Sequence, residues 1–187
     1  MDTNKIIVDL CGGTGAWSAP YLEAGYDVRL VSLPGTDVRS YEPPVNVYGV
    51  LAAPPCTHFS VSGAQYWKAK DADGRTFADI TILTACLMII ARVKPVFWAI
   101  ENPVGRMRNM LGPPDLIFNP CDFGDPWTKK TYLWGEFNPP ALHLVTPIRY
   151  CRQGSWIQQL GGSSQKTKKL RAITPPGFAR AFFEANR

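Results

Sequence analysis

The sequence has few of the residues that build metal centres and membrane anchors. Among its 187 residues are two histidines, His58 and His143, and five cysteines without a CxxC pair, so the usual spacing of a zinc site is missing. The most apolar stretch, residues 80–91, is interrupted by polar side chains and is shorter than the ~20 residues that cross a bilayer. No signal-peptide pattern follows the polar first residues. We therefore expect a cytoplasmic protein with reduced thiols and no structural metal.

Negative charge is scarce in the last third of the chain. Residues 129–187 contain ten Lys and Arg against two Asp and Glu, a formal charge of +8, whereas residues 1–128 contain ten against thirteen, a charge of −3. A basic run is often only a solvated surface, but an excess of this size attracts a polyanion. Nucleic acid is therefore a candidate partner.

Alternating strand and helix patterns predict the fold class. The length is that of one domain, and a long apolar helix is expected at about residues 77–93. β-Branched and apolar runs predict strands at residues 5–10, 26–33, 45–53 and 94–101. This order is typical of an α/β protein with a mostly parallel sheet and helices on both faces. The proline- and glycine-rich stretches 112–120 and 138–147 are expected to be loops.

Three short segments follow the carboxyl ends of these strands, where α/β sheets bind ligands. They are the glycine turn at residues 11–15, the loop that begins at Pro54, and the "ENP" at residues 101–103. Each is weak alone, because glycine turns, packed cysteines and Asn-Pro strand ends are common. Their shared position predicts one crevice.

The glycine segment "DLCGGTGAWS" is similar to a dinucleotide fingerprint but lacks the G-x-G-x-x-G spacing, since Ser18 stands at the last position. A site for NAD is therefore disfavoured. A tight turn around an adenosine-containing cofactor such as S-adenosylmethionine fits as well, and a turn needed only for sheet packing is the alternative.

Cys56 follows two prolines, which hold its side chain in a defined direction at a strand end. A lone cysteine is more often an inert buried thiol. Glu101 changes this interpretation, because a carboxyl on the apolar strand "VFWAIENP" is costly without a partner or a task. Apolar surroundings would raise its pKa and leave it able to act as an acid. A nucleophilic thiol and a protonatable carboxyl form a plausible catalytic pair.

Five segments together resemble the cytosine-C5 DNA methyltransferases, and the chain is most similar to the small phage-type members of that family. They are "DLCGGTGAWS", "PPCTHFSVSG", "DGRTFADI", "ENP" and "TPPGFARAFFEA", in the family's order and approximate spacing. The resemblance covers about residues 5–135 and 170–187. It implies a Rossmann-like, S-adenosylmethionine-dependent methyltransferase fold and, for a phage protein, the cytoplasm of a bacterial host.

The resemblance also implies a mechanism. The thiolate of Cys56 would add to C6 of a cytosine while Glu101 donates a proton or hydrogen bond at N3. C5 would then take the methyl group of S-adenosylmethionine. The base must leave the duplex stack, and residues 57–74 would form the mobile loop that closes over it. Either Lys129 or Lys130 would replace the family arginine that contacts the cytosine O2, with a solvated lysine pair as the alternative.

Cofactor contacts are carried over position by position. The implied set is Asp9, Cys11, Gly13, Thr14, Gly15, Asp37, Val38, Pro55 and Thr174. Family members usually have an aromatic residue at position 11, an asparagine at position 172 and an acidic residue at the end of the second strand. Here Cys11 and Ala172 stand instead, and no acid precedes Asp37, so Asp37 serves the ribose as well or cofactor binding is weaker or altered.

The recognition segment is much shorter than in larger relatives. We assign residues 1–135 and 170–187 to the catalytic domain and residues 136–169 to a short basic segment that contacts DNA. Proteins that read a specific duplex sequence bury ~1,000 to 2,500 Å² of protein surface, more than so short a segment offers. We therefore expect loose or very short sequence preference. We also expect a monomer. A basic surface hairpin is the alternative for this segment. The expected DNA contacts are Ser60, Arg75, Arg149, Arg152, Lys166, Lys168 and Lys169.

Two other functions stay open. The same chemistry could act on a cytosine nucleotide or single-stranded DNA, or use a modified cofactor, because the recognition segment is small and the ribose acid is missing. A catalytically silent DNA-binding module is the second. It would bind DNA without methyl transfer.

Overall fold

The computed structural model describes residues 5–150, 152, 154–160 and 164–187. A six-stranded sheet in the order β2-β1-β3-β4-β6-β5 forms its centre. The strands are β1 (Ile6–Leu10), β2 (Asp27–Val31), β3 (Val47–Ala52), β4 (Phe97–Pro103), β5 (Leu116–Phe118) and β6 (Thr131–Glu136). The helices are α1 (Ala19–Glu23), α2 (Trp67–Ala72), α3 (Arg75–Val93), α4 (Arg108–Leu111), α5 (Trp156–Gln159), α6 (Gln165–Ala172) and α7 (Pro176–Ala185). Three 3-10 turns complete the described chain, η1 (Val38–Ser40), η2 (Val61–Tyr66) and η3 (Pro120–Asp122).

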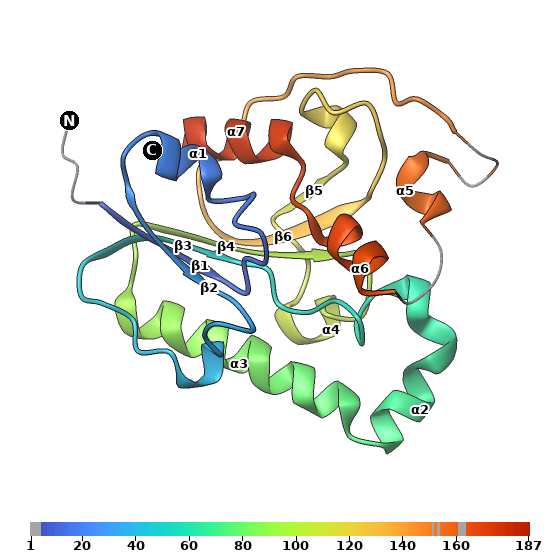
Figure 1. The fold of residues 1–187 in the computed structure, drawn as a ribbon, viewed down its shortest axis with the longest axis horizontal. Coiled ribbons are helices and arrows are strands. Elements are labelled where there is room, and N and C mark those ends of the chain that lie inside the picture. Colours follow the sequence, from blue (N-terminus) through green and yellow to red (C-terminus); the bar gives the residue numbers. More distant parts are fainter. Residues whose placement is uncertain (1–4, 151, 153, 161–163) are drawn as a thin grey trace.

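The predicted fold class is confirmed. Strands β2, β1, β3 and β4 are parallel, and β6 runs antiparallel to both β4 and β5. Helices α1 and α7 lie on one face of the sheet, whereas α3 and α4 lie on the other (Figure 1). The protein is therefore a mixed α/β domain with a Rossmann-like, mostly parallel sheet.

Each face of the sheet has its own core. On one face, Leu83 and Ile90 of α3 pack against the β-branched residues of the strands. On the other, aromatic rings dominate, with Trp17, Phe178 and Phe182 in mutual contact at centroid distances of 5.5 to 5.8 Å. Burial of both faces explains why the parallel strands are nearly continuous apolar runs.

Helix α3 is longer than the apolar stretch recognised in the sequence. By length and composition alone it is the one described helix that could cross a membrane, a test that core helices also pass. Its inner side chains lie in the core, and Asp79 is buried and paired with His58. Phe77 and Met88 remain exposed.

Two predicted loops contain secondary structure. The stretch 112–120 was expected to be irregular, which is wrong, because β5 lies within it and pairs with β6. Residues 57–74 contain η2 and α2. The prolines that flank β5 and the glycines within residues 57–74 do not favour regular structure locally. Contacts with distant residues therefore stabilise both elements: β6 pairs with β5, and Arg106 binds Asp71 of α2.

The topology brings four chain segments to one edge of the sheet. The carboxyl ends of β1, β3 and β4 lie side by side, with Leu10 opposite Ala52 and Ala52 opposite Ile100. Because β6 is antiparallel to β4, its first residue Thr131 pairs with Pro103. The lysines just before β6 therefore reach the same edge as Glu101.

Candidate active site

Cys56 lies four residues beyond the end of β3, in a segment fixed to the neighbouring strand. The buried amide of Asn102 donates a hydrogen bond of 2.9 Å to the carbonyl of Pro54. The Cys56 carbonyl accepts from the N–H groups of Phe59 and Ser60 at 3.0 and 2.9 Å, which closes a tight turn. The half-buried Cys56 thiol is thus held between two anchored backbone segments.

Glu101 lies on β4 with a side chain that is 17% exposed. Burial raises the pKa of this carboxyl, and the charge of Lys129 opposes that shift. The Lys129 Nζ and Glu101 Oε1 atoms are 4.0 Å apart, whereas Lys130 is exposed. The structure therefore brings Lys129, rather than Lys130, to the carboxyl.

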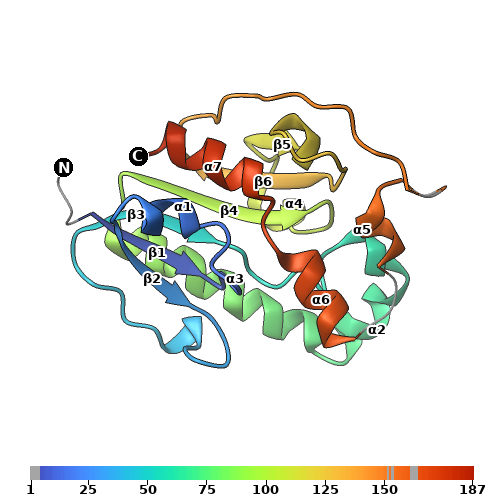
Figure 2. The same ribbon diagram turned by 45° about the horizontal axis from the view of Figure 1, so that its top comes forward.

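The thiol and the carboxyl share one electrostatic environment. Burial raises the pKa of the Cys56 thiol, and the negative charge of Glu101 raises it further. The charges of Lys129 and Arg171 lower it. Coulombic effects of this kind act over short distances in a protein interior. Both figures place α6, which carries Arg171, beside the segment that follows β3 (Figure 1, Figure 2).

The glycine turn after β1 has the backbone shape that its sequence predicts. Cys11, Gly13 and Gly15 have positive φ angles of 57°, 58° and 73°, a region that favours glycine. No atom of the described residues lies within 4 Å of the position that a Cβ on Gly13 would take. The Gly13 N–H donates to the Ser32 hydroxyl at 3.2 Å, which ties the turn to the end of β2.

Asp9 lies beneath this turn and is fully buried. The Ser18 hydroxyl donates to its Oδ2 atom at 2.6 Å, while Oδ1 has no hydrogen-bond partner within the described part of the chain. Burial raises the pKa of Asp9 to about 7, against the lowering effect of Ser18. A Cβ on Gly12 would meet the carboxyl at 2.4 Å, so only glycine fits above it. Asp9 supports the turn from below.

The remaining predicted cofactor residues surround the same edge. The Asp37 carboxylate is engaged by Arg39, which lowers its pKa to about 2. Val38 is buried in the core, and Pro55 and Thr174 are half-buried. No carboxylate stands at the end of β2, where Ser32 follows Val31. The open space beside Gly13 lets a ligand approach the backbone of the turn closely, which fits an adenosine-containing cofactor.

Arg106, which follows β4, binds the segment 57–74 and so connects it to the sheet. Its guanidinium donates to the His58 carbonyl at 2.9 Å, to both Asp71 carboxylate oxygens at 2.8 Å and to the Thr76 hydroxyl at 2.7 Å. It also lies 4.8 Å from the centroid of the Trp67 ring. Lys70 adds a 2.7 Å hydrogen bond to the Thr57 carbonyl. These contacts define one position of the segment above the sheet edge.

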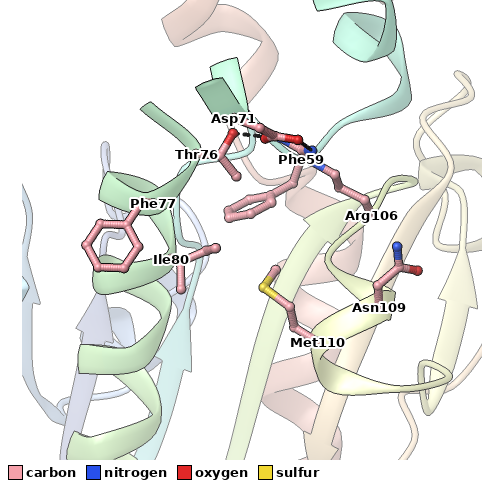
Figure 3. Close-up of a pocket in the computed structure, with 8 residues that line it drawn as sticks. All are labelled: Phe59, Asp71, Thr76, Phe77, Ile80, Arg106, Asn109 and Met110. Atoms are coloured by element: carbon pink, nitrogen blue, oxygen red, sulfur yellow. Dashed lines mark hydrogen bonds and ion pairs between the residues drawn. The ribbon is translucent and has the colours of Figure 1, made fainter. Parts of the chain in front are cut away.

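A cavity of about 360 Å³ lies behind this segment, between α3 and α4. Phe59 and Met110 point into the space, and the Arg106 contacts close one end (Figure 3). Its lining is Phe59, Asp71, Thr76, Phe77, Ile80, Arg106, Asn109 and Met110. None of the predicted catalytic or cofactor residues lines it, so it is separate from the Cys56 site.

The predicted DNA contacts are spread over the surface. The Ser60 hydroxyl accepts from the Ser62 N–H at 3.4 Å, and Arg75 pairs with Asp73. Arg149 donates to the Arg152 carbonyl at 2.9 Å. Arg152 and Lys169 are exposed, whereas the side chains of Lys166 and Lys168 lie outside the described residues. In the described part of the chain, no group of three His, Cys, Asp or Glu side chains could hold a metal ion.

Comparison with known proteins finds similarity only among solved structures. No protein-family model matches the sequence, and no curated protein does. One similar solved structure is that of a candidate DNA modification methyltransferase encoded within a prophage, from E. coli. The two chains are 20% identical with a TM-score of 0.48, over 76% of this chain and 53% of that chain. A likeness this distant establishes no family. The function proposed below therefore rests on the residues of this chain.

Arg171 is the site residue that the sequence did not reveal. It stands 115 positions after Cys56 in the numbering, and its local signal, the basic run "KTKKLRA", indicated DNA contact or a solvated surface but no role in catalysis. The Cys56 thiol therefore lies within electrostatic range of one carboxyl, Glu101, and of two cations, Lys129 and Arg171, and Lys129 is 4.0 Å from that carboxyl. Such a group can attack an electron-poor ring carbon and donate a proton to a ring nitrogen.

Proposed function

We propose that the protein is a DNA cytosine-C5 methyltransferase that uses S-adenosylmethionine and has low sequence specificity. The observation that carries the proposal is geometric: the segment of Cys56 is hydrogen-bonded to the end of β4 through Asn102 and Pro54, beside Glu101, and Lys129 is 4.0 Å from the Glu101 carboxyl. Their proximity at the β3–β4 edge suits a single flat heterocycle. The basic last third favours DNA as the partner, and we place the protein in the cytoplasm as a monomer.

The glycine turn is the proposed cofactor site. Gly13, Thr14 and Gly15 would approach the cofactor through their backbone, with Val38 and Pro55 beside its adenine. S-adenosylmethionine supplies an electrophilic methyl group when bound. Asp9 and Ser18 hold the turn in shape from beneath, and Ser32 is the one polar side chain found at the end of β2.

Cys56 acts as the nucleophile in the proposed reaction. The thiol loses its proton, and the thiolate forms a bond to C6 of cytosine, which moves electrons of the C5–C6 double bond toward C5 and N3. Glu101, whose pKa is raised by burial, donates a proton to N3 so that charge does not accumulate on the ring. C5 takes the methyl group. Release of the C5 proton to solvent then re-forms the C5–C6 double bond and breaks the sulfur–C6 bond to give back the thiolate, while N3 returns its proton to the Glu101 carboxylate.

Lys129 and Arg171 assist the first step. Because a thiolate rather than a thiol attacks, the raised pKa of Cys56 is a cost. Two cations that lower this pKa increase the reactive fraction near neutral pH. Lys129 would also hold the cytosine O2 beside Glu101. The target base must be extruded or already unstacked, since C6 is inaccessible in a duplex.

The decisive experiment measures covalent capture and methyl transfer together. Wild-type protein should form a denaturation-resistant adduct with DNA that contains 5-fluorocytosine, because the fluorine cannot leave as the C5 proton does. Cys56→Ala should abolish both the adduct and transfer of labelled methyl groups. Cys121→Ser is the matched control, since Cys121 is half-buried on η3 and outside the proposed site. Normal turnover of Cys56→Ala would refute the proposed nucleophile.

Ser32 favours one alternative with the same chemistry. A carboxylate at the end of the second strand usually binds ribose hydroxyls in nucleotide-binding sheets, and here Asp37 is already engaged by Arg39. A modified cofactor or a smaller substrate such as a cytosine nucleotide would fit this change. Methyl transfer to free dCMP but not to DNA would replace the main proposal, and DNA binding without any adduct would indicate a silent module.

A further inference from the structure

The chain between β6 and α6 forms an extended strap rather than a folded recognition domain. Among its described residues, the four-residue helix α5 is the only helix or strand. Figure 1 shows the strap, in orange, running around the outside of the molecule to α5 and α6. Readers of duplex DNA place a helix or a two-stranded ribbon in the major groove. The described strap offers neither element at sufficient length.

Backbone hydrogen bonds attach the strap to the loop before β6. The N–H groups of His143, Val145 and Ile148 donate to the carbonyls of residues 122, 121 and 126 at 2.8 to 2.9 Å. Its side chains are left to face solvent, with Tyr150 54% exposed. The exposed apolar side chains are Leu142, Leu144, Ile148 and Tyr150. Such a series is unusual on a soluble surface that has no partner.

An aromatic pair continues this surface toward the active site. The rings of Trp127 and Trp156 meet edge to face at a centroid distance of 5.7 Å, and both residues are half-buried. Ser155 fixes α5 to the chain before β6, because its hydroxyl donates to the Thr128 carbonyl at 3.0 Å. The next residue, Lys129, reaches Glu101. Aromatic surface and proposed cytosine pocket are therefore joined through consecutive residues.

Positive charge borders the same surface. Arg152 and Lys169 are exposed, and Arg171 is close enough to act on the Cys56 thiol. Both views place α5 and α6 next to the segment 57–72 (Figure 1, Figure 2). Cations beside aromatic rings that are at least partly exposed are the arrangement that binds single strands, in which phosphates meet the cations and bases stack on the rings.

We infer that Tyr150, Trp156 and Trp127 form a stacking platform for single-stranded DNA that leads the target cytosine to Cys56. The inference rests on the proposed function and names its substrate. A single strand presents bases that are already unstacked, so the cost of extrusion, a few kcal/mol in a duplex, is small. It also needs no groove-reading element. The short recognition segment is then sufficient for its task.

The test compares binding of one sequence in two forms. A fluorescent 20-nucleotide strand that contains cytosines and a hairpin duplex of the same sequence are titrated with the full chain, with anisotropy as the readout. We expect the single strand to bind at least tenfold more tightly. Tyr150→Ala and Trp156→Ala should each weaken it by roughly 5- to 100-fold, as loss of one stacked base implies. Equal or tighter duplex binding would overturn the inference.

Two further variants make the result interpretable. Phe77→Ala removes another exposed aromatic side chain, on α3, and should leave binding unchanged. Trp156→Phe keeps a stacking ring and should bind like wild type even if Trp156→Ala unfolds, and failure of that rescue would count against the platform. Single-strand binding that persists in Cys56→Ala separates this inference from the chemistry. Absence of the 5-fluorocytosine adduct in the wild-type protein, with single-strand binding intact, would refute the proposed function and not the platform.

Discussion

The sheet and the strap are built in opposite ways. The sheet encloses its functional carboxyls, Asp9 fully and Glu101 to all but 17%, and fixes them through strand pairing. The strap exposes Leu142, Leu144, Ile148 and Tyr150 and is held by backbone hydrogen bonds over its first half. Formal charge follows the same division, with −3 over residues 1–128 and +8 over residues 129–187. Chemistry that needs shifted pKa values requires burial, whereas contact with a polyanion requires exposed cations.

The chain segments on either side of the strap meet near Cys56. Lys129 acts on the thiol from the chain before β6, and Arg171 from the basic helix α6. The residues that flank the strap therefore contribute charge to the reaction site. A set of substitutions can show whether the two regions act separately or through this shared point.

Glu101→Gln gives the largest expected effect. Gln has nearly the same shape but cannot donate an acidic proton to N3, so methyl transfer should fall by roughly 10²- to 10⁴-fold, as for loss of a general acid. Single-strand affinity should stay within about twofold. Radiolabelled methyl transfer and anisotropy measure the two quantities. Glu136→Gln, an exposed change on β6, is the control, and equal loss in both variants would show that Glu101 has no special role.

Asp9→Asn tests the sheet separately from the strap, because it should change the pH dependence of the free energy of unfolding. The pKa of Asp9 is about 7 in the folded protein, against 3.8 for an unperturbed aspartate side chain, so the folded state binds an extra proton between these values. The free energy of unfolding should therefore fall as the pH rises from about 4 to about 7, and then level off. At roughly 1.4 kcal/mol per pKa unit, the loss is a few kcal/mol.

Urea denaturation at pH 5 and pH 8 provides the measurement. Asn cannot ionise, so Asp9→Asn should be more stable than wild type at pH 8 and similar at pH 5. Asp27→Asn on the neighbouring strand is the control because its carboxyl is 38% exposed. A variant that is less stable than wild type at pH 8 would mean that Asp9 is ionised and bonded in the fold.

The strands and the site differ in how far the sequence predicts them. Apolar runs located β1, β3, β4 and α3 within a few residues, because burial on both faces leaves a local pattern. Strand β5 was missed because it is three residues long between prolines, and its order comes from β6. Helix α2 was missed for a similar reason, since Arg106, a distant residue, anchors it.

The paired groups of the site follow the same rule. Cys56 and Glu101 could be predicted because each stands at a strand end, and parallel strands bring such ends together. The choice between Lys129 and Lys130 could not be made from sequence, since one position changes which side chain faces β4. Arg171 lies on a helix that no strand pairing connects to Cys56. Its approach depends on how α6 packs, which local patterns do not encode.

Arg171→Gln tests the junction and should have a moderate effect. Removing a cation that lowers the Cys56 pKa should raise that pKa, so the pH profile of transfer should move to higher pH. Activity should fall several-fold at neutral pH and recover in alkaline buffer. The alkylation rate of Cys56 by iodoacetamide against pH measures the shift directly. Arg180→Gln is the control and should leave the pH profile unchanged, because Arg180 lies on α7 and pairs with Glu23. An unchanged profile in Arg171→Gln would show that the Arg171 charge does not affect the Cys56 thiol.

The smallest expected effect is on the salt dependence of binding. Each cation that contacts a single strand changes the slope of log affinity against log salt by about 0.7, because counterions are released. Replacing exposed Arg152 and Lys169 with Gln should therefore reduce the slope by about 1.4. Replacing Arg92 and Lys94 at the far end of α3 is the matched control and should not change it. Anisotropy titrations between about 50 and about 300 mM salt give the slope. An unchanged slope in the first pair would assign the basic charge to solvated surface, and would leave the aromatic rings as the main source of affinity in the strap.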